Sequence, residues 1–195
     1  MLSVVVLISG GGSNLLALLE ALENPMVPAR IAAVGSDNPA DGLAHADLFG
    51  VPTFVVTPNA FATTEEWARV LKENIDHFKP DLVVLAGFMK ILPASFVAAY
   101  SPNIINIHPS LLPDFKGAHA VRDALNAGAK VTGTTIHVVD AGVDTGPIVA
   151  QARVEISPED SETHLHNKIR AVEHKLLVQT VIDIANGRLN LGSAK

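Results

Sequence analysis

The sequence predicts an α/β fold with a mainly parallel, Rossmann-like sheet and helices on both faces. Short runs rich in β-branched residues alternate with longer amphipathic stretches, the pattern of strand–helix–strand units. Apolar residues make up 48% of the 195 residues and charged residues only 17%, enough to cover both faces of a sheet. The loops that follow the predicted strands carry glycine and polar residues, at the edge where such sheets bind ligands.

The first part of the chain contains the parallel strands and the helices that connect them. The expected strands are Ser3 to Ser9, Arg30 to Gly35, Thr53 to Val56, Leu82 to Ala86 and Ile104 to Ile107. The expected helices are Asn14 to Leu22, Gly42 to Phe49, Thr64 to Phe78 and Ala94 to Ala99. The segment 63–66 has the pattern of a capping box, which fixes the start of the third helix.

The pattern changes after residue 117. A helix from His119 to Asn126 precedes two runs, Thr132 to Asp140 and Pro147 to Ile156, that are close enough to pair antiparallel at the edge of the sheet. A closing helix follows Ser161 and is expected to end near Asn186, where Gly187 supplies a stop. Because 195 residues are too few for two domains of ordinary size, residues 1–195 are expected to form a single domain.

Charge and composition narrow the classes of function. Lys and Arg total 14 against 20 Asp and Glu, so the chain lacks the basic balance that nucleic-acid binding needs. No apolar run approaches the roughly 18 to 20 residues that span a bilayer. We therefore expect a cytoplasmic enzyme with neither a nucleic-acid nor a membrane partner. The absence of Cys excludes disulfides and a Cys nucleophile, and the low charged fraction fits a subunit that hides one surface in a homodimer.

A glycine loop, from Ser9 to Asn14, lies between the first predicted strand and the first helix. Its three consecutive glycines let the backbone approach an anion, and the first amides of the helix then point at it with the positive end of the helix dipole. The loop is therefore a candidate phosphate site, and a simple tight turn is the alternative interpretation.

Two other phosphate motifs fit this loop less well. Gly10 and Gly12 begin a dinucleotide fingerprint, and Asp37 after the second strand could be the ribose-binding acid of such a site. However, Leu15 stands where the third glycine should be, and no Lys follows as a P-loop requires. A phosphomonoester is favoured over a dinucleotide of the NAD type.

Asn106 and His108 are two positions apart at the end of an apolar strand. Their side chains therefore point to the same side, and an amide donor and an imidazole face one pocket. Pro109 and Pro113 restrict the backbone that follows. Each residue alone could be structural, but burying both without partners is costly, so the pair is interpreted as functional.

Asp144 is the third candidate for the same pocket. It lies in a sharp loop that contains Gly142, Gly146 and Pro147. A carboxylate there could orient the imidazole of His108 and favour its charged form, although an Asp in such a loop is often only a turn residue. An amide, an imidazole and a carboxylate together suit acyl transfer, which needs oxyanion stabilisation and proton transfer.

Four segments together resemble the phosphoribosylglycinamide formyltransferase family, in the same order and over nearly the whole chain. They are Gly12-Ser13-Asn14-Leu15, Leu85-Ala86-Gly87-Phe88-Met89-Lys90-Ile91-Leu92, Asn106-Ile107-His108-Pro109-Ser110-Leu111-Leu112-Pro113 and Asp144-Thr145-Gly146-Pro147. The third segment and the distant Asp are shared by the wider group of 10-formyltetrahydrofolate formyltransferases. The first segment narrows the resemblance to this family.

The resemblance implies the formyltransferase fold and transfer of a formyl group from 10-formyltetrahydrofolate, as co-substrate, to a phosphoribosylated glycinamide in purine biosynthesis. It implies phosphate binding by Gly12, Ser13 and Asn14, ribose binding by Glu173, folate binding by Thr64, Met89, Lys90, Ile91, Leu92 and Asn106, and catalysis by Asn106, His108 and Asp144. Two positions depart from relatives: Lys90 stands where some carry Arg, and Thr64 where a basic residue can occur.

Three alternatives remain beside this interpretation. The other histidines could indicate a metal, but no spacing among them matches a site pattern, so no metal is expected; His119 and His137 are expected to line the pocket. A formyltetrahydrofolate hydrolase would use the same pocket with water in place of the amine. A non-catalytic nucleotide-binding module would explain the glycine loop but leave Asn106, His108 and Asp144 without a role.

Overall fold

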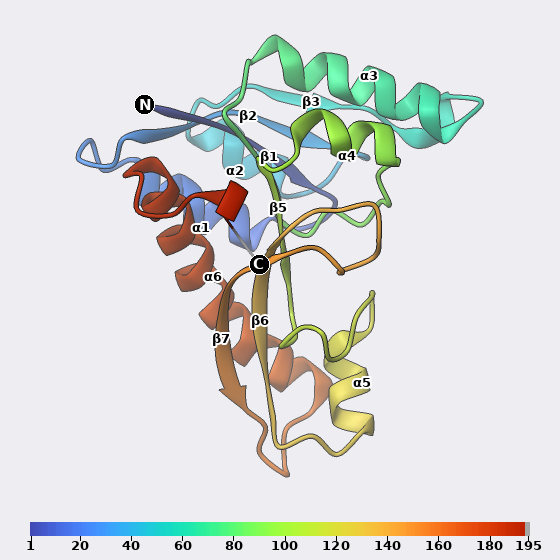
Figure 1. Cartoon of the computed structure of the whole chain (residues 1–195), viewed down its shortest axis with the longest axis vertical. Helices are drawn as coiled ribbons and strands as arrows, with labels where there is room; N and C mark the ends of the chain where they lie inside the picture. Colours follow the sequence, from blue (N-terminus) through green and yellow to red (C-terminus); the bar gives the residue numbers. More distant parts are fainter. Residues whose placement is uncertain (194–195) are drawn as a thin grey trace.

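Seven strands form one sheet in the computed structural model, which describes residues 1–193 (Figure 1). Across the sheet the strands follow the order β3-β2-β1-β4-β5-β6-β7. They are β1 (Leu2–Ile8), β2 (Ala29–Ser36), β3 (Thr53–Val55), β4 (Leu82–Leu85), β5 (Ile104–His108), β6 (Val131–Val138) and β7 (Ile148–Glu155). Strands β1 to β5 are parallel, while β6 and β7 extend the sheet antiparallel. The predicted fold class is confirmed.

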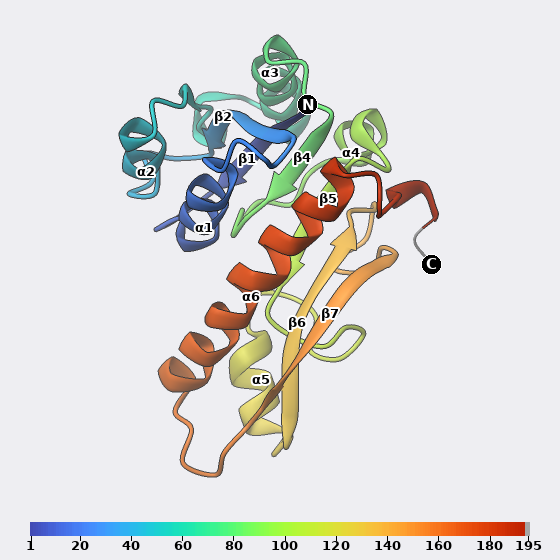
Figure 2. The same ribbon diagram turned by 90° about the vertical axis from the view of Figure 1, so that its left-hand side faces the viewer.

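The helices lie on both sides of this sheet. They are α1 (Ser13–Leu22), α2 (Leu43–Leu48), α3 (Thr64–His77), α4 (Ala94–Tyr100), α5 (Ala120–Asn126) and α6 (Glu162–Ala185). Helices α1 and α6 cover one face, and α3 and α4 the other (Figure 2). Every predicted boundary lies within 2 residues of the observed one. Two 3-10 turns, η1 (Pro58–Ala60) and η2 (Leu191–Ser193), are too short to leave a periodic signal in the sequence.

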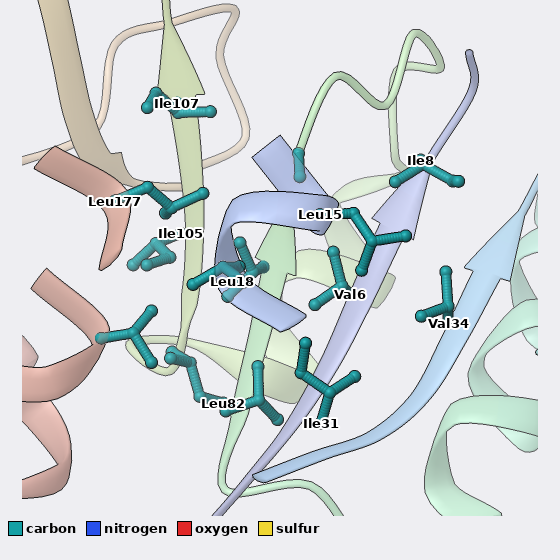
Figure 3. Packing of buried hydrophobic residues seen from close by; sticks show 14 of the residues in the cluster. Val6, Ile8, Leu15, Leu18, Ile31, Val34, Leu82, Ile105, Ile107 and Leu177 are labelled. Carbon is teal, nitrogen blue, oxygen red and sulfur yellow. The ribbon is translucent and has the colours of Figure 1, made fainter. Parts of the chain in front are cut away.

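Alternate residues of β1 enter two separate apolar clusters. Val4, Val6 and Ile8 pack with residues of α1 and α6 on one face (Figure 3), and Val5 and Leu7 pack with residues of α3 and α4 on the other. All five are fully buried, and each contributes roughly 1.5–3 kcal/mol through the removal of apolar surface from water. The loop that follows Ile8 therefore starts from a firmly held strand.

Side-chain caps fix the starts of α3 and α6. Thr63 Oγ1 accepts from the Glu66 amide at 3.1 Å, and the Glu66 carboxylate accepts in turn from the Ala62 amide at 3.2 Å. The predicted cap is confirmed, with the reciprocal bond one residue earlier than in the standard capping box. Ser161 caps α6 through the His164 amide at 3.1 Å. Within residues 1–193, no helix has the length and apolar character to cross a membrane.

Candidate active site

The glycine loop turns from β1 into α1 with Gly12 as the N-cap residue. Gly12 has φ 68°, a left-handed conformation that costs glycine little because it lacks a Cβ. Its carbonyl accepts the first helical bond from the Leu16 amide at 2.9 Å. The amides of Ser13 and Asn14 thus lie in the first turn, where N–H groups have no partner within the helix. This geometry suits an anion.

Glu173 of α6 joins the glycine loop from a distant part of the chain. Asn14 Nδ2 donates to Glu173 Oε2 at 3.3 Å, and both side chains are buried. Burial raises the pKa of Glu173 above its ordinary value, although hydrogen bonds from Asn14 and Thr134 and the charge of Arg170 act in the opposite direction. The structure therefore places the predicted ribose residue beside the predicted phosphate loop.

The predicted polar cluster forms where β5 meets the antiparallel strand β6. The register places His137 of β6 directly opposite Asn106 of β5. The loop between β6 and β7 then brings Asp144 back to the same point. Asn106 Nδ2 lies 3.2 Å from His137 Nε2 and 3.5 Å from Asp144 Oδ1. Asn106, His108 and Asp144 are thus together, as the sequence predicts.

Asp144 lies between two imidazoles. Its Oδ2 is 3.4 Å from His108 Nδ1, its Oδ1 is 3.5 Å from His137 Nε2, and the Gly117 amide donates to Oδ2 at 2.8 Å. Burial acts to raise the pKa of Asp144, but hydrogen bonds from His137 and Gly117 and the charges of both histidines lower it to about 2. Asp144 is therefore a carboxylate at neutral pH.

Both ring nitrogens of His108 face acceptors. Nε2 lies 2.8 Å from the Phe115 carbonyl, which can only accept, so Nε2 carries a proton. Burial lowers the pKa of His108 below its ordinary value, while the Phe115 carbonyl and the Asp144 carboxylate act to raise it. The sequence interpretation expected a charged imidazole. Asp144 acts in the predicted direction, but desolvation outweighs it, so the free enzyme holds His108 mainly neutral at pH 7.

A largely apolar cavity of about 240 Å³ opens beside this cluster. Its walls come from the segment after β4, the end of β5 and the loop after β6, and they include the predicted folate residues Met89, Lys90, Ile91, Leu92 and Asn106. Thr64, the remaining predicted folate residue, lines a second cavity of about 320 Å³. Lys90 and Ile91 border both cavities, so the two adjoin.

The structure places the other histidines and the acid that the sequence singled out. His137 lines the cavity as predicted, but His119 is exposed and is not part of its wall. Asp37 is buried, accepts from Asn38 Nδ2 at 3.0 Å and faces Lys90 Nζ at 3.8 Å. Asp37 therefore ties the end of β2 to the segment after β4, which gives it a role other than the ribose acid of a dinucleotide site.

Sequence reasoning assigned no role to the backbone groups of Phe115 and Gly117. Both lie between β5 and α5, and they bind His108 and Asp144 through a carbonyl and an amide. The contacts of a backbone group cannot be inferred from the identity of its residue. The one available signal is Gly117 itself, because a glycine in a loop can mark a positive φ, here 87°. Among residues 1–193, no group of three or more His, Asp or Glu side chains is arranged to hold a metal.

The fold and the cluster define a class of enzyme. An amide donor, an imidazole and a carboxylate at the edge of an apolar cavity can stabilise an oxyanion and move a proton, which is what the transfer of a small acyl group requires. Residues 2–181 match the family described as Formyl transferase.

Known proteins resemble the chain over almost its whole length. It is 40% identical over 192 residues to a phosphoribosylglycinamide formyltransferase of Escherichia coli, covering 97% of this chain and 90% of the relative. It is 43% identical over 182 residues to one of Mycobacterium tuberculosis, covering 93% and 84%. The crystal structure of glycinamide ribonucleotide transformylase 1 from Symbiobacterium toebii superposes with a TM-score of 0.94 at 40% identity, covering 97% and 90%. The chain belongs to the formyl transferase family, among the phosphoribosylglycinamide formyltransferases.

Proposed function

We propose that the chain transfers the formyl group of 10-formyltetrahydrofolate to the amine of phosphoribosylglycinamide. The products are the N-formyl ribotide and tetrahydrofolate, in de novo purine biosynthesis. The observation that carries the proposal is the cluster of Asn106, His108 and Asp144 at the edge of an apolar cavity, in a chain similar to such enzymes over 97% of its length.

The ribotide phosphate is assigned to the glycine loop and the ribose to Glu173. The left-handed N-cap at Gly12 and the first-turn amides of Ser13 and Asn14 offer donors with a favourable helix dipole. Glu173 accepts one bond from Asn14 through Oε2 and has capacity for a ribose hydroxyl. Because Thr134 contacts both Glu173 and the His108 carbonyl, this group and the catalytic cluster belong to one connected structure.

The cavity suits a folate. Its wall consists largely of apolar residues, and Met89 and Ile91 at its mouth are 73% and 76% exposed, available to cover a flat ring. Asn106 supplies a polar group to the same wall, beside His137. Thr64 and Lys90 border the adjoining cavity, and we assign the remainder of the folate to it.

The roles of the catalytic residues follow from the reaction. Bound folate supplies the formyl carbon, and the amine of the ribotide forms a new bond to it while the bond to nitrogen 10 of the folate breaks. Asn106 Nδ2 donates to the formyl oxygen as negative charge develops there. His108 takes the proton that the amine loses and returns it to the departing nitrogen, and Asp144 stabilises the imidazolium between these two steps.

This assignment requires His108 to leave its resting contact. Nε2–H donates to the Phe115 carbonyl in the free enzyme, and Nδ1 faces Asp144. For Nε2 to accept a proton from the amine, the Phe115 carbonyl must move away and the neutral ring must carry its single proton on Nδ1, facing Asp144. Phe115 has φ 52°, a left-handed conformation that is unfavourable for a bulky residue, so the loop is not held there by its local preference.

One assay separates this function from the hydrolase alternative. Purified protein is given 10-formyltetrahydrofolate with and without phosphoribosylglycinamide, and loss of the formyl group is followed. We expect turnover only with the amine, together with formation of the N-formyl ribotide. Strong turnover without the amine would instead identify a hydrolase, and no turnover in either case would leave a binding module.

The remaining expectations concern location and assembly. We propose that the chain binds no nucleic acid, on the grounds of its net charge of −6. We propose further that it acts in the cytoplasm on small-molecule substrates, without a membrane partner. We propose a homodimer on the grounds of the 17% charged fraction. Light scattering at several concentrations tests the dimer, and a monomer at every concentration would refute it without touching the catalytic assignment.

A further inference from the structure

The start of α2 packs directly against the glycine loop. The Gly42 amide donates to the Gly10 carbonyl at 3.0 Å, and His45 Nε2 lies 3.1 Å from the Gly11 carbonyl. Because a carbonyl oxygen only accepts, His45 must carry its proton on Nε2 and donate it. Two consecutive carbonyls of the glycine loop are therefore bound on the α2 side.

These two bonds determine where the neighbouring amides point. A trans peptide is planar, and its N–H points opposite to its C=O. Binding the Gly10 carbonyl therefore turns the Gly11 amide away from α2, and binding the Gly11 carbonyl does the same for the Gly12 amide. In the part of the chain that the structure describes, neither amide has a hydrogen-bond partner. Both are free to donate to an anion on the side opposite α2.

The glycine loop and the start of α2 pack so closely that there is no room for a Cβ at Gly42. A Cβ on Gly42 would lie 2.7 Å from the Gly10 oxygen and 2.9 Å from Gly12 Cα, both of them backbone atoms. A Cβ on Gly12 would lie 3.0 Å from Gly42 Cα and 3.5 Å from His45 Cδ2. The loop and the start of α2 therefore form one packed unit, with the His45 ring at its edge.

We propose that His45 is a positioning residue for the ribotide phosphate. Through the Gly11 carbonyl it holds the peptide between Gly11 and Gly12 in the orientation in which the Gly12 amide meets a phosphate oxygen. This inference rests on the proposed phosphate site at the glycine loop. His45 is not among the residues that line the catalytic cavity, so it acts on ribotide binding and leaves the chemical step alone.

The test is a split between ribotide KM and kcat. We expect His45→Ala to raise the ribotide KM about three- to tenfold, the loss that one hydrogen bond can supply, with kcat and the folate KM unchanged. His45→Gln retains an N–H donor at similar reach and should recover most of the affinity. The matched control is His77→Ala, which removes an exposed imidazole at the end of α3 and should change nothing.

A binding measurement complements the kinetics. In an amide NMR titration with inorganic phosphate, the Gly11 and Gly12 signals should shift in wild type and in His45→Gln. In His45→Ala, these shifts should reach saturation only at a higher phosphate concentration. Two results would overturn the proposal, provided that Gly12→Val still raises the ribotide KM. One is an unchanged ribotide KM in His45→Ala, and the other is a rise in His45→Gln as large as that in His45→Ala. If Gly12→Val also has no effect, the phosphate site itself is wrong, which separates the two failures.

Discussion

The two halves of the site recognise their ligands by different means. The glycine loop offers mainly backbone amides, aimed by a left-handed Gly12 and by contacts with α2. The cluster at β5 and β6 uses side chains, and four of them lie within 3.5 Å of a neighbour: Asn106, His108, His137 and Asp144. Binding at the glycine loop requires space around backbone atoms, whereas the cluster requires particular side-chain groups.

This difference predicts opposite sensitivities to mutation. In the glycine loop, direct damage comes from adding atoms, because a side-chain change cannot remove the backbone donors; removing the neighbouring His45 imidazole only disturbs their orientation. In the cluster, damage comes from removing atoms, because each polar group has a specific partner in a partly buried site. The first kind of change should affect ribotide binding, and the second the chemical step.

The largest effect is expected in the cluster. His108→Ala and Asp144→Asn should each lower kcat by about 10² to 10⁴, the range for loss of a general acid–base group, with small changes in ribotide KM. Steady-state kinetics with both substrates varied gives the two parameters. A large rise in ribotide KM with little change in kcat would show that the cluster serves binding.

The double variant tests whether the two residues act as a unit. Because Asp144 is proposed to act through the imidazole, removing it should matter little once His108 is gone. His108→Ala with Asp144→Asn should therefore be nearly as active as His108→Ala alone. Additive losses would mean that Asp144 has a role of its own, such as holding the Gly117 amide at 2.8 Å.

The next largest effect is expected in the glycine loop. Gly12→Val adds a branched side chain at φ 68° and within 3.0 Å of Gly42 Cα, so the loop must shift. We expect ribotide KM to rise about tenfold or more while folate KM stays the same, with the circular dichroism spectrum confirming the fold. Equal rises for both substrates would count against a phosphate site at this loop.

Glu173→Gln should have a smaller effect, of two kinds. The folded-state pKa of Glu173 is raised, so the folded protein binds that proton more tightly than the unfolded chain, and wild type loses stability as pH rises through the folded pKa. Gln cannot ionise and still accepts from Asn14. The variant should therefore have a higher Tm than wild type at pH 7, and this Tm difference should disappear at about pH 4. Its ribotide KM should be raised a few-fold. A Tm difference independent of pH would contradict the raised pKa of Glu173.

Most of the fold could be predicted because its signals are local. Buried parallel strands read as continuous apolar runs, as in Val4 to Ile8, and caps such as Thr63 mark helix starts. The position of His137 opposite Asn106 could not be predicted, because it depends on the register of strands separated by a long loop. The contacts of Phe115 and Gly117 were hidden because they are made by backbone atoms.

The charge state of His108 is the smallest effect and the most direct probe of the cluster. From sequence, Asp144 is a neighbouring anion that favours the imidazolium; in the structure, burial opposes it and the pKa of His108 falls below the ordinary value. In an NMR titration the His108 ring of wild type should therefore titrate below about pH 6.5.

Asp144→Asn keeps the size of the side chain but removes its charge, so the imidazolium loses its stabilising partner while burial remains. The pKa of His108 should then fall further. In the pH–activity profile of the variant, the loss of the His108 imidazolium should therefore occur at a lower pH. His164→Gln, which removes an exposed imidazole on α6, gives the assignment control by deleting one unrelated resonance. If the His108 resonance titrates at the same pH in wild type and Asp144→Asn, the carboxylate does not act on the ring, and its contacts with His137 and Gly117 must be its purpose.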